Sequence, residues 1–270
     1  MKKTFINTTH IEGWVYDHKL ELKQSGEKSK NPGTEYITGV VNIATDDACL
    51  NVVPVHFAYT TAITAKNKPN ATFNALKSII DGAPCVTKDG KDAAMKLRID
   101  SAIGLNEWFQ DGKDLVSTKR NEGGFVHVVD AIDEVEANRN TFECDMIING
   151  VRTMEADAEK NLPAKVIVKG VIFDYRKAIL PVEFSVTSAG GMKYFERLDV
   201  SPRTPLFTKV WGRQLSQTVR TEVREESAFG EDSVRVRESS RKDFVITGTA
   251  REKYAWDDET TILASDLDEM

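Results

Sequence analysis

The sequence predicts a mainly β protein made of two similar five-stranded barrels in tandem. An internal repeat carries this prediction: Gly39-Val40-Val41 leads into Val53-Pro54-Val55-His56-Phe57, and Gly170-Val171-Ile172 leads into Leu180-Pro181-Val182-Glu183-Phe184. Apolar side chains also alternate with period two in most of the longer segments, which is typical of strands. Repetition of a whole β unit at this distance indicates two copies of one small domain, and 270 residues are enough for both.

Strands and a single helix account for the first unit. Alternation predicts strands at residues 11–22, 36–44, 52–59, 96–109 and 115–129. A polar stretch with Gly and Pro, residues 23–33, forms a loop between the first two strands. A short helix is expected over 72–80, because Phe73, Leu76 and Ile80 share one stripe before Asp81-Gly82. Three strands, a helix and a closing hairpin are the order of an OB-fold, a Greek-key barrel.

The second unit repeats this order after a charged link at residues 130–140. Strands are expected at 141–155, 165–175, 179–186, 206–225, 233–238 and 243–249, with a short helix over 192–198. The expected domains are therefore an OB-fold-like barrel at 1–135, a second at 136–251, and an acidic tail at 252–270.

Charge is distributed unevenly along the chain. Residues 252–270 carry seven acids and one base, which equals the whole formal net charge of −6, so the body up to Arg251 is neutral. Dense acid and few aromatic residues indicate a flexible end. A neutral body with basic loops and a separate acidic tail remains compatible with a polyanionic partner.

The cysteines and the lengths of the apolar segments indicate the cellular compartment in which the protein is expected. Cys49, Cys85 and Cys144 are an odd number at wide spacing, which fits reduced thiols. The sequence has no apolar run of about 18 residues and no signal peptide. A cytoplasmic protein is therefore expected, in the host cytoplasm if the chain is phage-encoded.

Motifs of enzymes are absent from the sequence. The glycines lack phosphate-loop and dinucleotide spacing, and no serine or cysteine lies in a nucleophile motif. The four histidines show no metal-ligand spacing. We therefore expect no enzyme activity, no cofactor and no metal.

Basic and aromatic residues are interleaved on the predicted strands and loops. Alternation over residues 207–213 places two rings and two cations on one face: Phe207, Lys209, Trp211 and Arg213. Rings stack on unpaired bases while cations neutralise phosphates, so this pattern favours single-stranded nucleic acid. The expected binding residues are Trp14, Tyr16, Lys28, Lys30, Lys96, Arg98, Trp108, Lys119, Arg120, Lys209, Trp211 and Arg213.

Simpler interpretations stay open for several of these residues. Trp14 and Trp211 could each pack on a barrel core instead of stacking on a base. The lysines of the loops could be merely solvated, although the hairpin with Lys119 and Arg120 is expected to be a mobile cationic arm.

Five segments resemble those of a known family: NPGTEYITG at 31–39, RIDSAIGLNE at 98–107, KRNEGGF at 119–125, LPVEFSV at 180–186 and WGRQ at 211–214. They are similar to bacteriophage-encoded proteins with tandem OB-folds, described as single-stranded DNA-binding or SSB-like. The resemblance implies binding of single-stranded DNA, largely without sequence preference, in phage-type replication or recombination.

The acidic end resembles that of bacterial SSB, in which the tail recruits replication and repair proteins. Here the chain ends in Met270 and lacks the terminal phenylalanine of that motif. The residues expected to bind partners are Asp257, Asp258, Glu259, Asp266, Asp268 and Glu269. An alternative function is an OB-fold adaptor that recruits a recombinase, nuclease or host factor, and a third is a metal-dependent nuclease.

Overall fold

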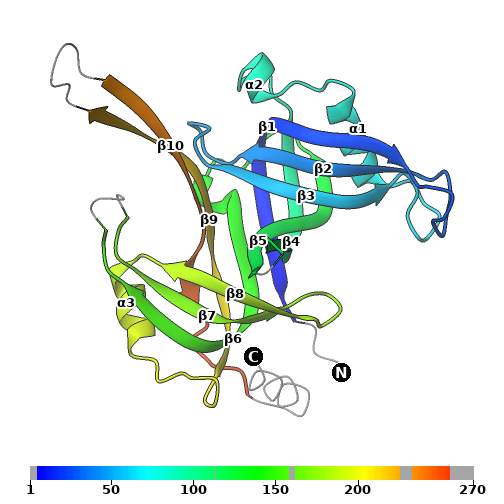
Figure 1. Cartoon of the computed structure of the whole chain (residues 1–270). Helices are drawn as coiled ribbons and strands as arrows, with labels where there is room; N and C mark the ends of the chain where they lie inside the picture. The colour runs from blue at the N-terminus through cyan, green and yellow to red at the C-terminus, as the bar shows by residue number, and fades with distance from the viewer. Residues whose placement is uncertain (1–4, 113, 158–161, 226–232, 256–270) are drawn as a thin grey trace.

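A computed structural model shows a mainly β protein in which the ten strands of the described residues belong to one sheet system (Figure 1). The structure describes residues 5–112, 114–157, 162–225 and 233–255, with backbone only for the strand residues between 217 and 241. The acidic residues expected to bind partners lie outside this range.

Five strands of the first half close into a ring. They are β1 (Asn7–Gln24), β2 (Glu35–Ala44), β3 (Val52–Thr61), β4 (Lys96–Gln110) and β5 (Asp114–Val128). The pairings run β1–β2–β3–β5–β4 and return to β1, and only β3–β5 is parallel. Because closure pairs the edges that an open sheet would expose, this arrangement forms a barrel.

The second half repeats the same ring. Its strands are β6 (Asn140–Met154), β7 (Lys165–Phe173), β8 (Ile179–Val186), β9 (Leu206–Glu225) and β10 (Ser233–Thr249). The pairings run β6–β7–β8–β10–β9 and return to β6, with β8–β10 parallel. The predicted fold class is confirmed. One detail is wrong: β10 is a single strand, because it pairs with β9 across the expected break at 239–242.

The repeated glycines of the sequence have a structural reason. A Cβ on Gly39 would lie 2.0 Å from the Lys19 carbonyl oxygen, and one on Gly170 would lie 2.1 Å from that of Ile147. Each glycine therefore allows the backbone of the second strand of a barrel to approach the first.

Short helical segments connect the strands. They are α1 (Ala71–Ile80), α2 (Val86–Asp89), the 3-10 turn η1 (Glu136–Asn138) and α3 (Ala189–Glu196). The side chain of Asn70 caps α1, and Phe73, Leu76 and Ile79 are buried. The apolar face of α1 therefore includes Ile79, which is more deeply buried than the expected Ile80. Ser188 caps α3, so that helix begins earlier than predicted.

β4 belongs to both barrels. Leu97 and Ile99 lie in the first hydrophobic core, whereas Ile103 lies in the second and Leu105 packs against it. The hairpin formed by β4 and β5 therefore extends from the first barrel onto the second, between the two lobes of the molecule (Figure 1). The strands of the first ring end at Val128 and those of the second begin at Asn140, while the domain boundaries themselves remain a prediction.

A buried amide network joins the two barrels. Asn121 Nδ2 donates to Gln214 Oε1 at 2.7 Å, and Gln214 Nε2 donates to Asn121 Oδ1 at 3.0 Å. The side-chain amides of Asn51 and Asn140 donate to the backbone carbonyl of Gln214 at 3.1 and 2.6 Å. All four residues are at most 9% exposed. Buried amides need partners, so these bonds fix how β3, β5, β6 and β9 meet.

We expect Gln214→Ala to lower the free energy of unfolding by about 2 to 4 kcal/mol, because it creates a cavity and leaves the Asn121 carbonyl without its donor. Urea unfolding followed by circular dichroism measures this. The control is Gln110→Ala, at an exposed site at the end of β4, which should stay within about 0.5 kcal/mol. Equal stability of the two variants would contradict the role of the network.

Candidate nucleic-acid interface

The two barrels share a continuous exposed surface where β1 meets both. Thr9 of β1 pairs with Ser101 of β4 on one side and with Phe142 of β6 on the other. Five strands therefore lie in the order β5, β4, β1, β6 and β9. The register places one row of side chains across them: Phe125, Asp100, His10, Thr141 and Arg213.

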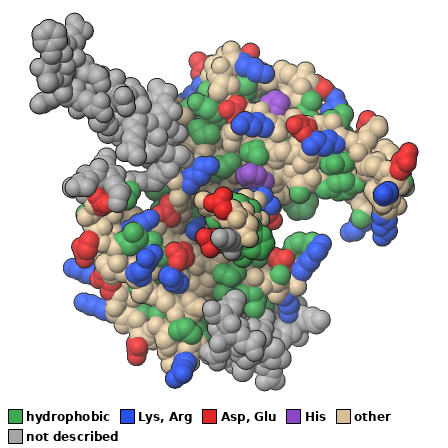
Figure 2. Space-filling view, viewed as in Figure 1, with side chains coloured by type: hydrophobic (Ala, Val, Ile, Leu, Met, Phe, Trp, Pro, Cys, Tyr) green, Lys and Arg blue, Asp and Glu red, His purple; other side chains and the backbone are tan. Residues whose placement is uncertain are grey.

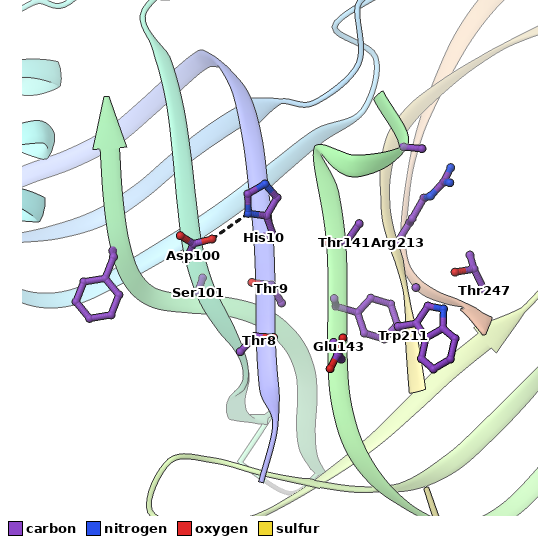
Figure 3. Close-up of a pocket in the computed structure, with 14 residues that line it drawn as sticks. Thr8, Thr9, His10, Asp100, Ser101, Thr141, Glu143, Trp211, Arg213 and Thr247 are labelled. Carbon is purple, nitrogen blue, oxygen red and sulfur yellow. Dashed lines mark hydrogen bonds and ion pairs between the residues drawn. The ribbon is translucent and has the colours of Figure 1, made fainter. Parts of the chain in front are cut away.

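A groove of ≈ 720 Å³ follows this surface (Figure 3). Its walls come from β1, β4 and β5 of the first barrel and from β6, β9 and β10 of the second. Both barrels thus contribute to one site. Trp211 and Arg213 of this groove are among the binding residues expected from the sequence, whereas His10, Asp100, Phe125 and Glu143 are not.

Trp211 forms an aromatic platform on the β9 side of the groove. Its indole packs on Gly248 of β10, where a Cβ would lie 2.4 Å from the ring nitrogen. Trp211 is nevertheless 38% exposed. The missing side chain at Gly248 therefore lets the indole rest on the strand while part of the ring stays open to the groove.

Charged side chains of both signs surround the platform. Lys209 Nζ lies 2.9 Å from Glu143 Oε1 and 5.9 Å from the centre of the Trp211 ring. Arg213 is exposed two residues further along β9, and no carboxylate pairs with it in the described part of the chain. A phosphate would therefore be attracted to Arg213 more than to Lys209.

His10 connects β1 to β4 inside the groove. Its Nδ1 lies 2.9 Å from Asp100 Oδ1 (Figure 3). Its Nε2 lies 3.4 Å from Glu12 Oε2. Periodicity begins the first strand at residue 11 and so leaves out His10, and it does not give the register of this strand with the strand that contains Asp100. The groove is therefore mixed in charge, because Asp100 and Glu143 line it beside Arg213.

A second cavity of ≈ 490 Å³ lies at the loop between β1 and β2. Tyr36 and Tyr59 lie with ring centroids 4.5 Å apart, and Ser25 Oγ is 3.2 Å from the Tyr59 hydroxyl. Lys30 lines this cavity, and Lys28 is exposed in the same loop. Both lysines are therefore accessible to a ligand.

Trp14 lies in a position unsuited to stacking. It is 7% exposed, with Lys91 Nζ 4.3 Å and the Arg139 guanidinium 5.5 Å from its ring centre. This placement agrees with the core-packing alternative. Tyr16 is half-buried at the β-bulge between Val15 and Asp17.

Three of the expected cations contact groups of the protein itself. Lys96 Nζ donates to the Asp130 carbonyl at 2.9 Å, and Arg98 Nε lies 3.8 Å from Asp100. Arg120 binds Glu122 and Asn106. These three side chains remain partly exposed.

Lys119 is a contact between barrels. It donates to the Glu183 carbonyl of β8 and lies 5.8 Å from the Phe184 ring centre. Burial lowers the pKa of Lys119. The expected mobile arm is therefore wrong, because Lys119 and Arg120 belong to β5 and are held by pairing with β4.

The tip of the β4–β5 hairpin is apolar and exposed. Trp108, Phe109 and Leu115 are 42%, 68% and 58% exposed. Figure 2 shows hydrophobic side chains gathered between the two lobes of the molecule, where Figure 1 places β4 and β5. Trp108 is thus accessible but distinct from the groove residues.

Phe207 does not join the exposed face of β9. It is 0% exposed and packs with Phe5 and Phe173, and the Tyr254 ring centre lies 4.8 Å away. The alternation is correct, but residues after β10 cover this end of the strand. The backbone of Tyr254 donates to the Phe207 carbonyl at 2.9 Å.

Within the described residues, no three His, Cys, Asp or Glu side chains are placed to hold a metal ion. No helix in the same part of the chain is long and apolar enough to cross a membrane.

Comparisons with known proteins give a family and a fold. The family model described as YorF matches residues 6–263, so the chain belongs to the YorF family. No sequence among the curated proteins matches. The fold is similar to the crystal structure of a deletion mutant of the single-stranded DNA binding protein from Thermus aquaticus, with a TM-score of 0.52 and 8% identity. That match covers 95% of this chain and 98% of the other.

The two tryptophans should differ in what they contribute to stability. Trp14→Ala should lower the free energy of unfolding by about 3 to 5 kcal/mol, because it empties a packed site. Trp211→Ala should cost about 1 kcal/mol or less, because the ring is partly exposed. Chemical denaturation measures both. A large loss for Trp211→Ala would mark its ring as structural.

Tyr254 should titrate abnormally. Burial, with Asp145 as the second cause, raises the pKa of Tyr254 from 10.0 to about 12. The neutral phenol therefore stabilises the folded state fully below about pH 10, and this contribution to the free energy of unfolding is lost as the pH rises through about 12. The titration curve of the Tyr254→Phe variant, subtracted from that of the wild type, should show one phenol that ionises near pH 12 when followed by ultraviolet absorbance. A difference curve centred near pH 10 would contradict the docking of this segment.

Proposed function

We propose that this member of the YorF family binds single-stranded DNA, largely without sequence preference, through the groove between its two barrels. The observation that carries the proposal is Trp211, an exposed ring supported by Gly248 beside Arg213, which pairs with no carboxylate of the described residues. The fold supports it further, since the Thermus protein with the same fold is described as a single-stranded DNA binding protein.

Stacking supplies the sequence-tolerant part of the binding. A base on an aromatic side chain contributes about 1 to 3 kcal/mol, and every base has a ring face. Duplex DNA keeps its bases stacked on each other, so it cannot use the Trp211 platform without unpairing. The same groove should therefore favour single strands over duplex.

Phosphate contacts should be few. Arg213, Lys28 and Lys30 are exposed, whereas Lys119 is half-buried and donates to the Glu183 carbonyl, and Lys209 is paired with Glu143. For single strands the logarithm of the binding constant falls with a slope of about −0.7 per neutralised phosphate against the logarithm of salt concentration. Three contacts would give a slope of about −2.

The biological role that we propose is protection and presentation of single-stranded DNA during phage-type replication or recombination, without catalysis. Residues 252–270 would bind partner proteins and compete with DNA for the basic loops. A second candidate is a protein-binding adaptor, and the exposed apolar side chains of Trp108, Phe109 and Leu115 favour it.

The test is a fluorescence-anisotropy titration of a labelled oligo-dT of about 30 nucleotides and of its duplex at several salt concentrations. We expect tight binding to the single strand alone, with the shallow salt dependence given above. Trp211→Ala should weaken binding about tenfold, in line with the loss of one stacked base. The matched control is Tyr194→Ala, which removes an exposed ring on α3 outside the groove and should bind normally.

A version ending at Ala255 tests the acidic tail and keeps Tyr254 docked on β9. We expect it to bind single-stranded DNA more tightly than the full chain. If neither version binds any oligonucleotide, the DNA-binding proposal fails and the adaptor becomes the better explanation.

A further inference from the structure

We propose that the groove contains a base-reading subsite for one unpaired guanine, formed by Trp211, Glu143 and Arg213. The proposal rests on the proposed function, since the guanine belongs to a bound single strand. It adds a preference for one base to a surface that otherwise binds without regard to sequence.

A carboxylate beside the stacking platform is the first reason. Glu143 of β6 is directly opposite Trp211 of β9 in the antiparallel register. Side chains in such positions lie about 5 Å apart at Cβ, so a base stacked on Trp211 has its edge within reach of Glu143. The Glu143 side chain is 40% exposed.

The charge of Glu143 excludes a role in holding the DNA backbone. A carboxylate repels phosphate and can only accept hydrogen bonds. It therefore suits the N–H groups of a base. Lys209 holds Oε1 of Glu143 at 2.9 Å, which orients the carboxylate, and a carboxylate retains several other lone pairs as acceptors.

Guanine is the base whose donors match a carboxylate best. Its pairing edge carries two neighbouring donors, N1–H and the N2 amino group, and a carboxylate can accept from both. Cytosine and adenine present one amino group beside a ring acceptor, and thymine presents one N–H between two carbonyls. Only guanine therefore offers Glu143 two adjacent hydrogen bonds without an opposed acceptor.

Arg213 supplies the complementary group. It is two residues from Trp211, so it lies on the same face of β9, about 6 to 7 Å along the strand. A guanidinium pairs with guanine O6 and N7, which together form an acceptor edge that the pyrimidines lack. Glu143 and Arg213 thus present an acceptor and a donor group around one stacking ring, and all three residues line the groove (Figure 3).

The charge balance of the groove agrees with reading a base more than with tracking a backbone. Its lining contains two carboxylates, Asp100 and Glu143, against the single guanidinium of Arg213. His10 is held by Asp100 and Glu12. A surface selected only for phosphate would not place acids at this point.

The test compares oligo-dT of 20 nucleotides with the same strand carrying one central guanine, hypoxanthine, 7-deazaguanine or adenine. Hypoxanthine lacks only the N2 amino group, and 7-deazaguanine lacks only the N7 acceptor. We expect the guanine strand to bind about tenfold more tightly than oligo-dT. Each strand with an altered base should bind about fivefold more weakly than the guanine strand.

Two variants assign the contacts. Glu143→Gln should abolish the difference in affinity between the guanine strand and the hypoxanthine strand. Arg213→Gln should abolish the difference between guanine and 7-deazaguanine. The control is Glu196→Gln on α3, outside the groove, which should retain every preference. Thermal melting confirms that each variant is folded.

The outcomes separate this proposal from the proposed function. Equal affinity for all five strands would overturn the subsite and leave single-stranded DNA binding intact. A guanine preference that survives Glu143→Gln would also overturn it, because another group would then read the base. Loss of binding to every strand by the wild type would instead reject the proposed function and the subsite with it.

Discussion

Hydrogen bonds of buried side-chain amides determine how the two barrels meet. Asn51, Asn121, Asn140 and Gln214 come from four segments and have little access to water, so each must find its partner in another. A shift of one barrel against the other would break several of these bonds at once. The row of groove residues on the other side of the same strands depends on this fixed arrangement.

Shared strands make the groove a property of the whole chain. β1 pairs with strands of both barrels, and Thr9 is the point where β4 and β6 flank it. Trp211 and Arg213 come from the second barrel, whereas His10 and Asp100 come from the first. A ligand in this groove would meet a surface that is already assembled, so little ordering of the protein would oppose binding.

Much of the fold can be predicted from the sequence because it depends on local periodicity. The strands, α1 and the order of elements in both halves follow from alternation, stripes and turn residues, and the repeated glycines mark equivalent places in the barrels. The site was harder to predict because it depends on register. Trp14 and Trp211 look alike in sequence, yet one lies between Lys91 and Arg139 and the other rests on Gly248. Likewise, no local pattern shows that Lys119 would reach across to β8.

The course of β4 limits how such a protein can arise and be divided. Two copies of one barrel suggest a duplication, after which each half would ordinarily remain able to fold alone. Here Ile103 and Leu105, which precede the second half by some 35 residues, complete the core of that half. A chain cut between the barrels would leave one fragment with an uncovered apolar arm and the other with an incomplete interior. The two barrels therefore depend on each other for folding, so neither can be deleted or replaced without the other.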